Sequence, residues 1–146
     1  MKDNFTLVEV MIVVGILVLL TALVVPNILR ARITVNEVGA ITSLKTIFSS
    51  AQIYKNINSV YPSSLGNLGD ANPPYIEEEL SCNDQPCSKQ GYNFTLTGSE
   101  YSFYAVASPQ NFGFTGIRSF YIDENGLVKY CDTADCDPSQ GIILQE

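Results

Sequence analysis

The chain contains no histidine and no tryptophan among its 146 residues. Histidine is the usual general base near neutral pH and a common zinc ligand, so its absence removes the ordinary hydrolytic triads and most zinc enzymes. The sequence also lacks a nucleophile elbow, a phosphate-binding glycine loop and a paired-carboxylate motif. We therefore do not expect an enzyme.

Basic residues are scarce and unevenly placed. Residues 1–57 carry five basic and three acidic side chains, a net charge of +2, whereas residues 58–146 carry three basic and twelve acidic side chains, a net charge of −9. A surface with this acidic excess would repel phosphate groups. Nucleic acid is therefore not expected as a partner.

One apolar run dominates the N-terminal part of the chain. It extends over 21 residues from Phe5 to Val25, and a helix of that length covers about 30 Å, the thickness of bilayer hydrocarbon. A cleaved secretory signal fits less well, because the run is long and no small-x-small cleavage site follows it. A single acid, Glu9, interrupts the run. A carboxylate in hydrocarbon is costly, so we expect Glu9 to have a specific partner.

The helical pattern continues beyond the apolar run. Pro26 removes one backbone donor, which predicts a kink rather than an end, because apolar residues at helical spacing resume after it. The predicted helix covers about residues 5–56. Its second half is expected to lay one apolar stripe on a following domain, made of Val38, Ile41, Leu44, Phe48, Ala51 and Tyr54. The predicted polar face consists of Asn36, Thr42, Ser43, Thr46, Ser49 and Ser50.

A recognisable signature occupies the start of the apolar run. It reads Phe5-Thr6-Leu7-Val8-Glu9-Val10-Met11-Ile12-Val13-Val14, and Pro26 follows. This pattern resembles the N-terminus of the type IV pilin superfamily, which includes the pseudopilins of type II secretion. The resemblance implies cleavage between Asn4 and Phe5 by a prepilin peptidase, N-methylation of Phe5, and assembly of the helices into a filament core. Asn4 stands where the family usually has glycine.

The resemblance gives Glu9 a partner. If Phe5 becomes the N-terminus, its ammonium group lies in the same apolar layer as Glu9 of a neighbouring subunit, and each charge compensates the desolvation of the other. Because this pair forms between subunits, the register of assembly depends on it. We therefore expect Glu9 and Phe5 to be the assembly residues.

The four cysteines form two similar pairs, Cys82-x4-Cys87 and Cys131-x4-Cys136. A membrane-anchored, exported domain favours disulfides over a zinc site, and structural zinc pairs more often have two residues between the cysteines. Spacing alone allows three connectivities. The two short polar loops favour the local pairs 82–87 and 131–136.

The C-terminal part is predicted to be a small antiparallel sheet. Residues 58–90 are rich in proline and glycine and indicate a connecting loop with a short turn near 76–80. Two hairpins follow, residues 92–96 with 101–106 and residues 118–122 with 127–130, the second around Asn125-Gly126. The fold class is thus α+β, a long N-terminal helix on a β-meander. Its aromatic residues are expected to form the core and cross-strand pairs: Tyr92, Phe94, Tyr101, Phe103, Tyr104, Phe120 and Tyr121.

The second hairpin also resembles family sequence. Residues 115–126 are similar to segments of pilins and of the major pseudopilin. Major pseudopilins carry calcium in a C-terminal loop, and here the acids near the last cysteine loop are weak candidate ligands. They are Asp132, Asp135 and Asp137, with Asp123 and Glu124 nearby. No EF-hand spacing is present, so no cofactor is the leading expectation and solvated loop acids are the simpler explanation.

The leading hypothesis is a structural subunit of a type IV pilus-like filament, held by a single span in a bacterial inner membrane and then exposed in a surface filament or a periplasmic pseudopilus. The alternatives are a type II secretion pseudopilin and a single-pass anchored binding domain that never polymerises. Expected partners are other copies of the chain, related pilins, the prepilin peptidase and an assembly machinery. The predicted segments are a leader peptide (1–4), a membrane and filament-core half-helix (5–26), an amphipathic half-helix (27–57) and a globular β domain (58–146).

Overall fold

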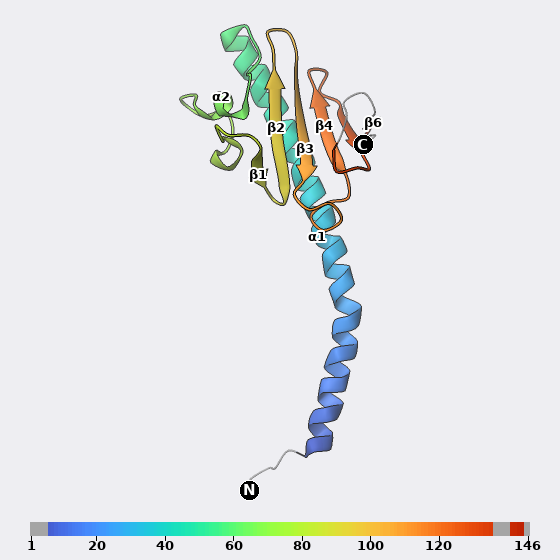
Figure 1. Ribbon diagram of the computed structural model, residues 1–146. Helices are drawn as coiled ribbons and strands as arrows, with labels where there is room; N and C mark the ends of the chain where they lie inside the picture. The colour runs from blue at the N-terminus through green and yellow to red at the C-terminus, as the bar shows by residue number, and fades with distance from the viewer. Residues whose placement is uncertain (1–5, 136–140, 145–146) are drawn as a thin grey trace. The chain divides into compact units, whose positions relative to one another are not determined.

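The computed structural model describes residues 6–135 and 141–144 (Figure 1). The chain forms two compact units, Met1–Arg32 and Ile33–Glu146. A single helix, α1 (Leu7–Asn58), contributes to both units. It runs through Pro26 without a break, which confirms that this proline does not end the helix. The kink at Pro26 stays a prediction.

The second unit contains one six-stranded antiparallel sheet. Its strands are β1 (Cys87–Lys89), β2 (Tyr92–Gly98), β3 (Phe103–Pro109), β4 (Ser119–Asp123), β5 (Val128–Cys131) and β6 (Ile142–Ile143). Their order in the sheet equals their order in the chain, so each strand pairs with the next. The predicted α+β fold with an antiparallel meander is confirmed.

The two predicted hairpins are present, with longer strands than expected in the first. β2 pairs with β3 from Tyr92–Pro109 to Gly98–Phe103, and β4 pairs with β5 across the Asn125-Gly126 turn. Gly126 has φ +78°, a value that a glycine adopts without strain. The sequence did not predict the short strands β1 and β6 or helix α2 (Leu65–Gly69). The turn expected near 76–80 is the 3₁₀ helix η1 (Glu78–Leu80).

The face of α1 that packs on the sheet differs from the predicted stripe. The fully buried apolar residues of the helix are Ala40, Leu44, Ile47 and Ala51, at steps of four, three and four. Val38 is 58% exposed, so its assignment to the core was wrong. Ser43 and Ser50, which were placed on the polar face, are buried. Small hydroxyl residues can be buried when they are hydrogen-bonded, and Ser50 Oγ donates to the carbonyl of Tyr75 (2.9 Å).

Most of the aromatic residues do form the core. The side chains of Tyr92, Phe94, Phe103 and Phe120 are almost completely buried. Tyr104 and Tyr121 form a ring pair with centroids 6.1 Å apart, a contact between the neighbouring strands β3 and β4. Tyr101 is the exception, since it is 78% exposed. Its position before β3 places it in the turn rather than in the sheet, so the predicted role in packing was wrong.

Candidate functional site

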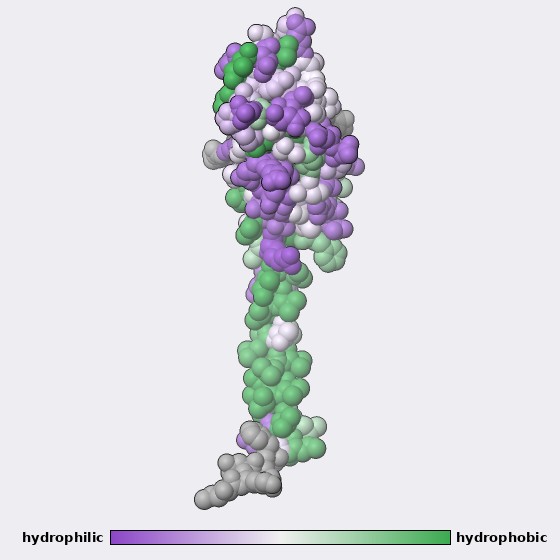
Figure 2. Space-filling model, turned by 90° about the vertical axis from the view of Figure 1, so that its left-hand side faces the viewer, coloured by the Kyte–Doolittle hydropathy of each residue, from purple (hydrophilic) through white to green (hydrophobic). Residues whose placement is uncertain are grey.

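The N-terminal part of α1 is largely apolar on all sides, and no large hydrophobic side chain of this part is buried among the described residues. Its large hydrophobic residues from Leu7 to Leu29 are between 43% and 76% exposed. Figure 2 shows this apolar segment, residues 7–29, as a mostly green, hydrophobic surface with a pale patch about halfway along it. Among the described residues, α1 is also the helix long and apolar enough to cross a membrane. Such a surface is stable only in lipid or against other apolar surfaces.

Glu9 lies in the first turn of this apolar segment. Its backbone amide is hydrogen-bonded to Thr6 through the carbonyl (3.1 Å) and the side-chain oxygen (3.3 Å). Thr6 therefore occupies the capping position of the helix. Within residues 6–135 and 141–144, no side chain forms an ion pair with the Glu9 carboxylate. The predicted partner, Phe5, and the residue before the predicted cleavage, Asn4, lie outside the described residues.

A second glutamate of α1, Glu37, occupies the opposite kind of environment. It is only 3% exposed and lies in the unit Ile33–Glu146. Its Oε2 accepts hydrogen bonds from Arg118 Nη2 (2.7 Å) and Nε (3.1 Å), and its Oε1 accepts one from the backbone amide of Ile117 (3.1 Å). The carboxylate thus has both its charge and its lone pairs satisfied.

Aromatic residues surround this ion pair. The Arg118 guanidinium lies 5.5 Å from the ring centre of Tyr130 and 6.0 Å from that of Phe120. The Tyr92 hydroxyl donates to the backbone carbonyl of Arg118 (2.8 Å). Burial, and secondarily the Glu37 carboxylate, raise the pKa of Tyr92, so the phenol stays neutral. Hydrogen bonding to Glu37 raises the pKa of Arg118.

The sequence did not single out Glu37 or Arg118. Glu37 stands one residue before the predicted apolar stripe, and Arg118 was assigned to the start of a strand and to the family-like segment 115–126, with no role in a site. The two are 81 residues apart, so no local spacing connects them. The available signal was indirect, because Glu37 follows the helical step of the buried residues Ala40 and Leu44.

The first predicted disulfide is present. Cys82 and Cys87 are bonded, with their Cα atoms 5.6 Å apart, and the bond fastens the start of β1 to the preceding loop. Cys131 is also disulfide-bonded. Its predicted partner, Cys136, lies outside the described residues, so the 131–136 pair stays a prediction.

The candidate calcium ligands do not gather into a site in the part of the chain that the structure describes. Within that part, no three acidic or cysteine side chains lie together in a way that suits a metal ion. The carboxylate of Asp123 is used in the β4–β5 turn, where it accepts from the Asn125 amide (2.9 Å) and Lys129 Nζ (3.5 Å). Asp137 lies outside the described residues. Calcium binding through Asp132, Asp135 and Asp137 stays a prediction.

Comparison with known proteins finds relatives of a single kind. The type II secretion system core protein G of Aeromonas hydrophila is 31% identical over 126 residues, which cover 84% of each chain. The protein of the same name from Pseudomonas aeruginosa is 40% identical over 114 residues, 71% of this chain and 74% of its own. The match to the Vibrio cholerae protein is 42% identical but spans 43% of that protein's length. No protein-family model matches the chain.

Proposed function

The chain belongs to the family of type II secretion system core protein G, within the type IV pilin superfamily, and on this premise we propose that it is the structural subunit of a pseudopilus. A pseudopilus is a type IV pilus-like filament of a secretion system. The relatives favour this member of the superfamily over a surface pilus, because they are core proteins of type II secretion systems.

The observation that carries the proposal is the exposed apolar segment of α1, in which no large hydrophobic side chain is buried among the described residues. Before assembly this segment spans the inner membrane once, where lipid covers it. After assembly the same surface is covered by the apolar segments of neighbouring subunits. A monomeric anchored domain would need the segment only in the first of these two states, and it would offer the Glu9 carboxylate no intersubunit partner.

Glu9 sets the register in this proposal. Its carboxylate pairs with the N-terminal ammonium of Phe5 in a neighbouring subunit, so two charges that are costly alone compensate each other inside the filament core. A shift of one subunit along its neighbour would separate the charges and leave both desolvated. The pair therefore selects one axial arrangement among many that bury the same apolar area.

The Phe5 amine exists only after processing. We propose that a prepilin peptidase cuts between Asn4 and Phe5 and that the new amine is N-methylated. Assembly then needs a membrane platform and an ATPase, together with related pseudopilins that join the same filament. Mass spectrometry of the mature chain tests this step directly. A chain that begins with methylated Phe5 is expected, and an intact N-terminus at Met1 would contradict the proposed pair.

A deletion strain separates the candidate functions. Loss of this chain is expected to abolish export of a secreted protein and to leave surface pili unchanged. Secretion that continues while sheared surface fibres disappear would instead identify a type IV pilus subunit. Crosslinking that finds only monomers under assembly conditions would identify the anchored binding domain.

A further inference from the structure

The loop between β3 and β4 presents an unusual group of apolar side chains to solvent. Phe114 is 74% exposed, Phe112 is 48% exposed and Ile117 is 49% exposed. Residues 110–117, here called the aromatic loop, contain no charged residue. An exposed aromatic group of this kind is typical of an interaction surface, where aromatic side chains often contribute most of the binding energy.

The aromatic loop is held in one conformation. Inside it, the amides of Phe114 and Gly113 donate to the carbonyls of Asn111 (3.0 Å) and Gly116 (2.8 Å). Two side chains of α1 fasten it from outside. Asn36 Nδ2 donates to the carbonyl of Thr115 (2.9 Å), and the buried Glu37 accepts from the amide of Ile117. A loop that is ordered before binding loses little conformational entropy when a partner binds.

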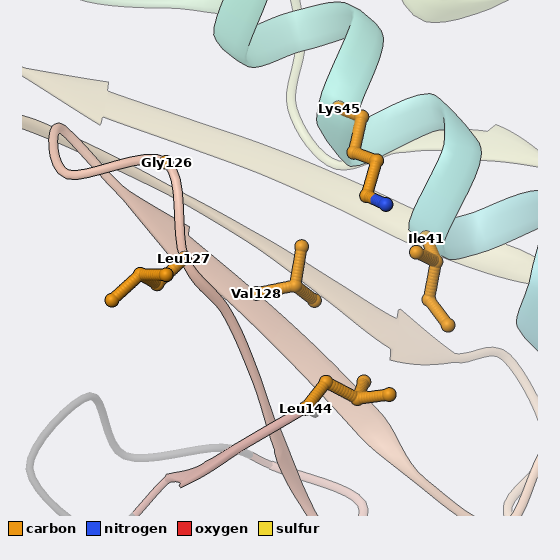
Figure 3. A pocket seen from close by; sticks show the side chains of 6 residues that line it. All are labelled: Ile41, Lys45, Gly126, Leu127, Val128 and Leu144. Carbon is orange, nitrogen blue, oxygen red and sulfur yellow. The ribbon is translucent and has the colours of Figure 1, made fainter. Parts of the chain in front are cut away.

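An apolar hollow lies elsewhere on the same unit, between α1 and β5. It has a volume of about 290 Å³ and is lined by Ile41, Lys45, Gly126, Leu127, Val128 and Leu144. Figure 3 shows the side chains of Ile41, Val128 and Leu144 around this space, with the Lys45 amine reaching toward it. The hollow is at the small end for small-molecule pockets, which span about 300–1,000 Å³. It is better suited to one or two large apolar side chains.

We propose that the aromatic loop of one subunit packs into the apolar hollow of the next copy of the chain, with Phe114 as the inserted side chain. This inference rests on the proposed filament. The loop and the hollow are different surfaces, so the contact is heterologous, and a heterologous contact that does not close into a ring repeats without limit along a filament. A two-fold dimer contact would have required one self-complementary patch.

Charge and position both favour a second copy as the occupant. Residues 58–146 have a net charge of −9, so copies repel unless their contact avoids acids. This contact does so as far as the described residues go, because the loop has no charge and the described charged residue that lines the hollow is Lys45. The ties of the loop at Asn36 and Glu37 are separated along α1 from the hollow at Ile41 and Lys45 by about 10 Å at 1.5 Å per residue.

This separation has a direct consequence for assembly. If the α1 helices of two copies are parallel, insertion of the loop into the hollow displaces one copy along the helix by about 10 Å. The contact therefore staggers successive subunits rather than placing them at one level. It would act together with the Glu9 pair, since both contacts fix the axial position of one subunit on the next.

Cysteine crosslinking in filaments tests the contact. The full chain with Phe114→Cys and Lys45→Cys, treated with a short bismaleimide, is expected to give a ladder of dimers, trimers and longer species. Cells that express two chains, each with one of these substitutions, are expected to give dimers only. The native Cys82–Cys87 bond does not react with the reagent. The matched control is Phe114→Cys with Thr46→Cys, because Thr46 is exposed on α1 about 100° around the helix from Lys45.

The outcomes separate this contact from the proposed function. Filaments that form and support secretion without the 114–45 crosslink, or that crosslink mainly 114 to 114, would overturn the contact and leave the pseudopilus proposal intact. A chain that never forms filaments would overturn both.

A second set of variants gives an independent readout. Phe114→Ser is expected to shorten filaments and lower secretion at least fivefold, whereas Phe114→Leu keeps most of both. Tyr101→Ser is the control, because Tyr101 is equally exposed in the β2–β3 turn. Equal behaviour of Phe114→Ser and Tyr101→Ser would overturn the contact.

Discussion

Each of the two units contains an acidic residue of helix α1, and the environments of these two residues are opposite. In Ile33–Glu146, Glu37 is buried and its carboxylate accepts three hydrogen bonds, two of them from Arg118. In Met1–Arg32, Glu9 is exposed on an apolar helix, and no described side chain pairs with it. Glu37 finds its charge partner within its own molecule, whereas the proposed partner of Glu9 belongs to a neighbouring subunit.

This difference shows where each unit obtains its stability. The unit Ile33–Glu146 buries its apolar residues against its own sheet, so its fold needs no neighbour. In the part of the chain that the structure describes, the apolar segment at residues 7–29 buries none of its large side chains. Its environment must come from lipid or from other subunits. The comparison therefore predicts that substitutions in the two units change different measurements.

The largest effect is expected from Glu9→Ala. Without the carboxylate, the ammonium of Phe5 in the neighbouring subunit stays buried and uncompensated, at a cost of about 3 kcal/mol or more, so association weakens at least about a hundredfold. Removal of a charge also favours the membrane-bound monomer. We expect normal membrane levels and normal unfolding of the globular unit, but almost no filament-sized species when intact cells are crosslinked and the assemblies are sized.

Val13→Ala is the matched control for this experiment, because it removes apolar volume from the same segment and no charge. It should lower filament yield much less than Glu9→Ala does. A normal filament yield from Glu9→Ala would contradict the intersubunit pair. It would also show that Glu9, contrary to the proposal, does not depend on a partner in another subunit.

A smaller effect, on stability alone, is expected at the Glu37–Arg118 pair. Arg118→Ala leaves a buried carboxylate without its cation and should lower the free energy of unfolding by about 3 kcal/mol. Glu37→Ala leaves the Arg118 side chain, which is 38% exposed, so water can partly solvate its charge. It should cost only about 1–2 kcal/mol. Urea unfolding of the detergent-solubilised chain measures both values.

The double variant sharpens this test. With both Arg118 and Glu37 replaced by alanine, the buried charge is gone, so the chain should be about as stable as Glu37→Ala alone. Additive losses would mean that the two side chains do not act as a pair. If Arg118→Ala and Glu37→Ala lowered the free energy of unfolding equally, the deeper burial of Glu37 would have no effect on stability.

The smallest effect is expected from Tyr92→Phe. At pH 7 this variant loses the hydrogen bond to the Arg118 carbonyl and about 1 kcal/mol of stability. Burial raises the pKa of Tyr92 above its ordinary value, so the folded state holds the phenolic proton more tightly than the unfolded state does. The neutral Tyr92 phenol therefore makes its full contribution to stability below about pH 10, and this contribution falls as the pH rises further.

Phenylalanine has no proton to lose, so the advantage of the unsubstituted chain over Tyr92→Phe should shrink above about pH 10. Thermal unfolding between pH 7 and 11 measures this gap. Tyr101→Phe is the control, since Tyr101 is exposed and the gap at that position should stay near zero. A gap at Tyr92 that is constant with pH would contradict the raised pKa.

Much of the fold could be predicted from local sequence. The long helix follows from uninterrupted apolar residues and helical spacing, and the second hairpin follows from Asn125-Gly126, whose glycine has the positive φ that such a turn requires. β1 and β6 escaped prediction because strands of three and two residues are too short to show a period. They form because a longer strand is already beside them, at β2 and β5.

The site was predictable in its N-terminal half and not in its globular half. Glu9 stands out because one acid in an apolar run is costly wherever the run lies. Glu37 looks like an ordinary polar residue of an amphipathic helix, and only the folded chain brings Arg118 to it. The packed face of α1 differs from the predicted stripe for the same reason, because contacts between distant residues decide it. Ser50 is buried because the Tyr75 carbonyl accepts from it, and sequence spacing gives no sign of that contact.

The order of the strands also bears on how the globular unit can mature. Every strand from β2 to β6 pairs with the strand before it in the chain. If the residues after α1 are exported across the membrane in chain order, each strand from β2 to β6 emerges after the strand with which it pairs. Folding can thus proceed vectorially, in step with translocation, and no strand has to wait for a distant segment. Contacts of this local kind are also the ones that form fastest.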